Sequence, residues 1–312
     1  MKKVISAVTA CFVSSFLFLT GCSDPDAELK SKVPDSVDAA AFVDGVKMVK
    51  NKAVSKAIND AAEELKDEKI SIADLENRYL FFGSVSQHFG GVVLQSREGK
   101  AEQFFKKICD ALKKSGISVV EKTDAKECLI TLPENIPQIP AIPLFMKLYH
   151  QDLLLIAYGK TDPAFFKSSK PNRIFQYICF DYTVSAAYSV DLSAVPQEAK
   201  QGLAMLPALY DLNLIMLNVP NPDDDLTLEF HFTKEDSAGQ VLAALNMGLA
   251  LFAQKDPELS GMIKRSTEKN ILKITLGTKF FEYAQKAAED AKTQISTAGA
   301  ANLQQEKDAV RK

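Results

Sequence analysis

Two stretches of the sequence carry apolar patterns in the same order, and this repetition constrains the fold more than any other feature. Each stretch opens with a short apolar strand, Ala40–Asp44 in the first and Ala186–Asp191 in the second. A hairpin of strands, an amphipathic helix and a further strand follow in both stretches. The repetition predicts an α+β fold of two related domains, each an antiparallel sheet packed by amphipathic helices. Two unrelated α+β segments are the alternative.

The remaining elements follow from hydrophobic periodicity. Residues 226–232 alternate strictly between apolar and polar side chains, as a half-buried antiparallel strand does. Residues 237–253 and the stretch after Gly99 place their apolar side chains on one face of a helix. A further helix is expected at about residues 46–66. Further strands are expected at residues 79–85, 91–95, 117–121, 128–132, 153–159, 212–217 and 271–277.

The first residues have the charge order of a secretory leader. Lys2 and Lys3 precede an uncharged, mostly apolar run that ends at Leu19. The run is short for a stable membrane span, which needs about 20 apolar residues. We therefore expect residues 1–21 to be a signal peptide. An uncleaved N-terminal transmembrane helix is the alternative.

The end of this leader, Leu19-Thr20-Gly21-Cys22, resembles the lipobox of bacterial lipoproteins that signal peptidase II processes. The resemblance implies that the peptidase recognises Leu19, Thr20 and Gly21 and that Cys22 is lipidated. A cysteine thiolate is the nucleophile that accepts the lipid, and two or three acyl chains suffice for stable anchoring. Membrane lipid is therefore one expected partner. In the proteobacterial sorting scheme Ser23 favours the periplasmic face of the outer membrane over the outer leaflet of the inner membrane.

A second resemblance concerns the start of the folded part. Val33-Pro34-Asp35, followed by Ala41-Phe42-Val43-Asp44, resembles the opening of repeats in uncharacterised bacterial lipoprotein families with tandem α+β repeats. This resemblance implies no activity. Residues 22–32 are polar and lack an apolar period, so a lipidated tether is expected there. The first domain is expected at residues 33–175, the second at 176–298, and a polar tail at 299–312.

The net charge of the chain argues against partners that are strongly negatively charged. The chain has 37 basic and 40 acidic residues, and loss of the leader removes Lys2 and Lys3, which leaves a net charge near −5. Because proteins that bind nucleic acids normally present a basic face, no nucleic-acid partner is expected. A polybasic second contact with the membrane is not expected either.

Three cysteines remain after Cys22, and export would place them in an oxidising compartment where disulfides persist. Cys109 lies in a predicted helix and Cys128 in a predicted strand, so a bridge between them is conceivable. The favoured interpretation is that Cys109, Cys128 and Cys179 are thiols that act as small apolar side chains.

The sequence carries no recognisable motif for catalysis or metal binding. It lacks a G-x-S-x-G turn and the Walker and Rossmann glycine patterns. The three histidines lack the spacing of zinc ligands. His88 is expected in a turn, His150 in a helix end or loop, and His231 on the polar face of a strand.

Residues 221–232 resemble a calcium loop only in part. Asn221, Asp223 and Asp225 supply oxygen atoms at the first, third and fifth positions. Leu226 stands where the loop requires glycine, and Phe232 stands where it requires glutamate. A hairpin turn with solvated acids is the expected structure, and we expect neither a metal nor a cofactor.

These observations favour a membrane-anchored, non-catalytic binding or scaffolding module that faces the periplasm and contacts an envelope protein. Two alternatives stay open. One is a hydrolase with a dispersed acid/base pair, which a histidine facing a carboxylate in a deep cleft would favour. The other is a carrier of an apolar ligand held between the two halves.

Overall fold

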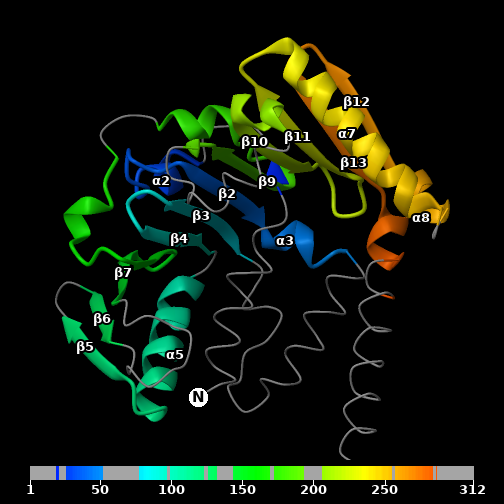
Figure 1. Cartoon of the computed structure of the whole chain (residues 1–312). Helices are drawn as coiled ribbons and strands as arrows, with labels where there is room; N and C mark the ends of the chain where they lie inside the picture. Colours follow the sequence, from blue (N-terminus) through cyan, green and yellow to red (C-terminus); the bar gives the residue numbers. More distant parts are fainter. Residues whose placement is uncertain are drawn as a thin grey trace, which may run out of the picture.

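The chain forms one large antiparallel sheet with helices packed against it (Figure 1). A computed structural model describes residues 19–20, 26–51, 77–96, 99–122, 126–131, 143–168, 172–192, 206–254, 257–283 and 286. The sheet has 13 strands within these ranges. The α+β fold class expected from the sequence is confirmed.

The strands are short and follow one another mostly through hairpins. Their bounds are β1 Leu19–Thr20, β2 Ala39–Asp44, β3 Arg78–Ser84, β4 Phe89–Gln95, β5 Ser118–Lys122, β6 Glu127–Thr131, β7 Leu144–His150, β8 Leu153–Tyr158, β9 Tyr182–Ser189, β10 Leu212–Val219, β11 Leu226–Phe232, β12 Ile263–Glu268 and β13 Ile271–Leu276. The helices are α2 Ala27–Lys30, α3 Gly45–Met48, α5 Lys100–Lys114, α7 Glu235–Ala253 and α8 Pro257–Met262, with 3-10 turns η6 Pro163–Phe165, η7 Arg173–Tyr177 and η9 Pro207–Asp211.

The strand order is the same in the two halves of the sheet. Outward from the centre, the first half runs β2-β3-β4-β8-β7 and the second runs β9-β10-β11-β13-β12. A long helix, α5 or α7, follows the third strand of each half in the sequence. The hairpin β5–β6 extends the first half alone. This correspondence supports the repetition read from the sequence, while the expected domain boundaries stay predictions.

The two halves share one continuous sheet because β2 pairs with β9. The pairing is antiparallel, with Ala41 opposite Ala186 and Ala40 opposite Ala187. Ala40, Ala41 and Ala187 are buried. The halves therefore meet edge to edge through backbone hydrogen bonds rather than as two separate bodies.

Both long helices lie on the same face of the sheet. Residues directly opposite each other on neighbouring strands point to one face. A row of such residues runs from the α5 side of the sheet to β10, through Leu94, Tyr79, Val43, Val184 and Val219. It continues into the apolar side chains of β11, of which Phe230 and Phe232 pack against Val241 of α7. The apolar side chains of β11 thus lie on the α7 face, where Leu226 and Phe232 are buried and Leu228 and Phe230 are half-buried.

The opposite face carries α2, η6, η7 and the largest apolar core. Aromatic rings pack across this core, with ring centroids 4.7 Å apart for Phe42 and Phe180 and 6.0 Å apart for Phe145 and Phe166. Leu29 of α2 is fully buried in it. This burial fixes the start of the chain's folded part against the centre of the sheet.

The structure corrects two expectations. Residues 26–32 pack against the body instead of forming a tether, since Asp26 is 1% exposed and Leu29 is fully buried. His150 ends the strand β7 and does not lie in a helix end or loop. Of the helix expected at 46–66, α3 covers the start, and residues 52–66 lie outside the described residues.

Candidate functional site

The residues of the expected lipobox that the structure describes, Leu19 and Thr20, lie at the start of β9. Leu19 and Thr20 form β1, with Leu19 opposite Val184 and Thr20 opposite Tyr182. Gly21 and Cys22 lie outside the described residues. The lipidation of Cys22 therefore stays a prediction, and the nearest described residue after it is Asp26.

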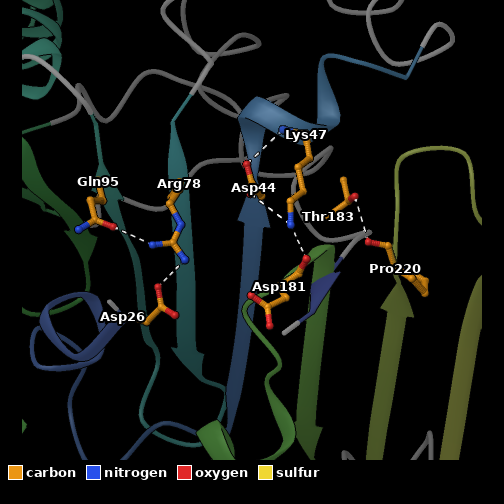
Figure 2. A network of polar contacts seen from close by, with 8 residues as sticks. All are labelled: Asp26, Asp44, Lys47, Arg78, Gln95, Asp181, Thr183 and Pro220. Atoms are coloured by element: carbon orange, nitrogen blue, oxygen red, sulfur yellow. Dashed lines mark hydrogen bonds and ion pairs between the residues drawn. The ribbon is translucent and has the colours of Figure 1, made fainter. Parts of the chain in front are cut away.

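Asp26 forms a buried ion pair with Arg78, the first residue of β3 (Figure 2). Arg78 also donates from Nη1 to Oε1 of Gln95 over 3.2 Å, and its guanidinium lies 4.9 Å from the centroid of the Phe42 ring. Arg78 and Gln95 are cross-strand neighbours, so the strand register places the amide beside the guanidinium. The site thus holds the carboxylate of a residue four positions after the predicted lipidation site.

The environment of Asp26 opposes its ionisation. Burial raises the pKa of the Asp26 carboxyl above its ordinary value of 3.8, and the charge and hydrogen bond of Arg78 offset only part of that effect. The nearby Asp181 carboxylate raises the pKa further. The ion pair is therefore formed at a cost, which the rest of the segment's packing must balance.

The segment after Asp26 supplies that packing. Leu29 and Val33 are fully buried. The Lys30 ammonium lies 4.4 Å from the centroid of the Phe180 ring. Glu28 Oε1 lies 2.8 Å from His150 Nε2, and the Ser168 amide donates to the Ser31 carbonyl over 3.1 Å. The four-residue spacing of Leu29 and Val33 is a sequence signal for this docking, although it is too short to stand out among polar neighbours.

Three further strands, β2, β9 and β10, end or begin along the same edge of the sheet (Figure 2). Asp44, the last residue of β2, accepts from the Lys47 amide over 3.1 Å, and the Lys47 ammonium reaches the Asp181 carbonyl just before β9. The Thr183 amide donates to the Pro220 carbonyl over 3.0 Å, which joins the start of β9 to the end of β10. We call this group the strand-end rim. It consists of Asp26, Asp44, Lys47, Arg78, Gln95, Asp181, Thr183 and Pro220 (Figure 2).

A second polar group lies on β11 and β13, on the face opposite α7. His231 Nε2 lies 3.4 Å from Glu229 Oε2, and Lys273 Nζ lies 3.3 Å from Glu229 Oε1. The hydrogen bond with His231 lowers the pKa of Glu229, and Lys273 lowers it further against the opposing effect of burial. His231 therefore faces a carboxylate, as the hydrolase alternative requires. Both of these residues lie on β11, however, and Lys273 lies on the neighbouring strand β13. The group forms a salt link along the sheet.

The other sequence-predicted residues have local roles. His88 has a φ of 52° in the β3–β4 turn, as expected. The Asn221 amide and side chain donate to Asp224 Oδ2, and Asp225 pairs with Lys264. Within the described ranges no cluster of three or more candidate metal ligands occurs.

Two of the three described cysteines lie in the same part of the core. Cys109 of α5 and Cys128 of β6 are buried in the same apolar cluster. Their thiols share a hydrogen bond, which raises the pKa of Cys109 and lowers that of Cys128. Cys179 is half-buried and lies outside that cluster.

No family model matches the chain, and no curated protein matches it either. Crystal forms III and IV of TP0453 each share 10% identity with it, with TM-scores of 0.40 and 0.41. Each alignment covers 80% of this chain, and 92% or 91% of the TP0453 chain. Likeness at this level carries no functional inference. Among the described residues, no helix has the length and apolar character to cross a membrane.

Proposed function

We propose that this chain is a lipid-anchored envelope protein whose folded body is held close to the membrane as a non-catalytic binding or scaffolding module. The observation that carries the proposal is the burial of Asp26 against Arg78, four positions after the lipobox cysteine. A chain spans at most about 3.6 Å per residue, so the body begins within about 14 Å of Cys22. Ser23 favours the periplasmic face of the outer membrane.

The sheet offers an edge for a partner. Within the described residues β5 pairs only with β6, so one side of β5 has unpaired backbone groups. Val120 of β5 is exposed. An extended segment of an envelope protein would add to such an edge as a further strand. The edge strand at the other end, β12, carries Lys264, Arg265 and Glu268, and charged edges resist such pairing.

The experiment compares the wild-type chain with Cys22→Ala, using Cys179→Ala as the matched control. Wild type and Cys179→Ala incorporate a labelled fatty acid and sediment with outer-membrane fractions. Cys22→Ala loses the label and leaves those fractions. Cross-linking in whole cells then recovers an envelope protein with the two anchored variants. Equal labelling of all three variants, or no cross-linked protein, contradicts the proposal.

A hydrolase is the second candidate because Glu229 and His231 lie 3.4 Å apart. The test is a panel of ester, amide and glycoside substrates with wild type and His231→Gln. The non-catalytic proposal requires that the two proteins be equally inactive. Turnover by wild type that His231→Gln abolishes would favour the hydrolase instead.

A further inference from the structure

We infer that the strand-end rim is the surface of the protein that faces the lipid bilayer, with Tyr182 at the level of the lipid headgroups. The inference rests on the proposed lipidation of Cys22 and names the surface that this anchor presents to the membrane. Tyr182 lies within the rim between Asp181 and Thr183 and is 37% exposed.

The chain that follows Cys22 enters the folded body at this rim, where Asp26 is paired with Arg78. Acyl chains attached to Cys22 therefore leave the protein from the rim end of the sheet. A tether as long as residues 22–32 would have allowed any face to approach the membrane, whereas the packing of Asp26 and Leu29 removes that freedom.

The opposite end of the strands is out of reach of the bilayer. Arg78 and Ser84 are the first and last residues of β3, and at about 3.3 Å per residue the strand separates them by about 20 Å. Val85 follows Ser84 and is 56% exposed. Val85 and Tyr182 are thus two exposed side chains at opposite ends of the same sheet.

The chemistry of the rim suits a neutral lipid surface. Tyrosine has an apolar ring and a polar hydroxyl, and this combination favours the headgroup region of a bilayer. The rim cation Lys47 lies 3.7 Å from Asp44, so its charge is already paired within the protein. The contact should therefore depend on the anchor and on Tyr182 and not on anionic lipid.

The exposed face of α7 is the competing surface. Met247 and Leu251 are 69% and 66% exposed there. Residues 237–254 also carry no charged side chain. Its connection to the lipidation site is indirect, because α7 packs on β11, β12 and β13 and not beside α2.

Tryptophan fluorescence tests the inference, because the chain contains no tryptophan. Single-tryptophan variants Tyr182→Trp, Val85→Trp and Met247→Trp of the lipidated full chain are reconstituted into phosphatidylcholine vesicles with brominated acyl chains. Lys50→Trp, one turn beyond Lys47, is a second rim reporter should Tyr182→Trp fail to fold. The rim reporters should lose most of their emission, while the Val85 and Met247 reporters keep theirs.

The outcomes separate the inference from the proposed function. A chain that does not sediment with the vesicles refutes the lipid anchor. A chain that sediments but shows equal quenching at all positions, or strongest quenching at Met247→Trp, overturns the orientation alone. In a further arm, a twelve-residue Gly/Ser insertion between Pro25 and Asp26 should preserve sedimentation and abolish the difference between the rim and Val85 reporters. A difference that survives the insertion also overturns the inference.

Discussion

Asp26 and Glu229 are both carboxylates in ion pairs, yet their surroundings shift their pKa values in opposite directions. Burial dominates at Asp26 and raises its pKa despite Arg78. At Glu229 the hydrogen bond with His231 dominates and lowers the pKa despite burial. At the residue scale, the two pKa shifts differ in sign because the partners of Glu229 outweigh its desolvation and the partners of Asp26 do not. The two shifts should therefore change how folding stability depends on pH.

Asp26→Asn and Glu229→Gln should change the pH dependence of folding stability with opposite signs. Because Asp26 has a raised pKa when folded, wild type should gain stability relative to Asp26→Asn as the pH falls through that pKa toward 3.8. Because Glu229 has a lowered pKa when folded, wild type should lose stability relative to Glu229→Gln as the pH falls from 4.5 through that pKa.

The measurement is urea denaturation of the three proteins from about pH 7 to about pH 3. The same sign for both differences would mean that the Arg78 pairing outweighs burial at Asp26. The desolvation of the Asp26 carboxylate would then be smaller than its interaction with Arg78, contrary to the raised pKa.

Alanine substitutions at two glycines test how closely the strand β4 packs against its neighbours, with a glycine of α7 as the comparison. A Cβ on Gly91 would lie 2.6 Å from the Ile156 carbonyl oxygen, whereas a Cβ on Gly248 in α7 would meet nothing within 4 Å. Gly91→Ala should destabilise the fold by about 1–3 kcal/mol through overpacking. Gly248→Ala should stabilise it by up to about 1 kcal/mol because alanine is the better helix former. Thermal unfolding of both variants checks this, and equal effects would contradict the packing.

Cys109 and Cys128 should cross-link on mild oxidation. Diamide would accept two electrons and two protons from the paired thiols, which then form one disulfide, once the edge hairpin β5–β6 opens transiently. Peptide mass mapping should find this bridge, and Cys179 should carry the alkylating label. A bridge to Cys179, or no bridge in the folded chain, would contradict the placement of the pair.

At the scale of elements, α7 has one face that packs against the sheet and one face that is exposed. Leu249 is 8% exposed and Met247 is 69% exposed. Leu249→Ala should cost about 2–3 kcal/mol of unfolding free energy, and Met247→Ala should stay within about 0.5 kcal/mol of wild type. Denaturation curves compare the two, and a large effect of Met247→Ala would show that this face is covered in the native protein.

Most long elements were predictable because their apolar side chains repeat over a whole face. Residues 226–232 follow the strand period, and residues 79–85 begin with a continuous apolar run. The observed β11 and β3 match these ranges to within a residue. The strand β12 carries a single apolar residue, Ile263, so only its pairing with β13 makes it a strand. The docking of α2 was missed because two apolar residues, Leu29 and Val33, give too short a pattern.

The candidate site was less predictable than the fold, for a physical reason. Asp26 and Arg78 are far apart in the sequence, and each is an ordinary charged residue in its local context. Their pairing depends on α2 packing over the start of β3, which no local periodicity encodes. Cys22, in contrast, stands in a motif of four consecutive residues, Leu19-Thr20-Gly21-Cys22, which can be recognised without knowledge of the fold.

At the scale of the whole molecule, two features join the parts of the chain: the pairing of the two sheet halves and the packing of α2 against the sheet. The pairing of β2 with β9 joins the halves into one sheet, and α2 packs over the centre of that sheet. The predicted anchor is therefore attached at the strand-end rim, where Asp26 pairs with the first residue of β3. A body held there should move with the membrane as a single unit.

The most direct test of the proposed lipid anchor is the mass of the N-terminal peptide of the chain isolated from bacterial membranes. We predict a peptide that begins at Cys22 and carries a diacylglyceryl group on sulfur and an acyl group on the amine. A peptide that begins at Met1, or one that contains an unmodified Cys22, would contradict it.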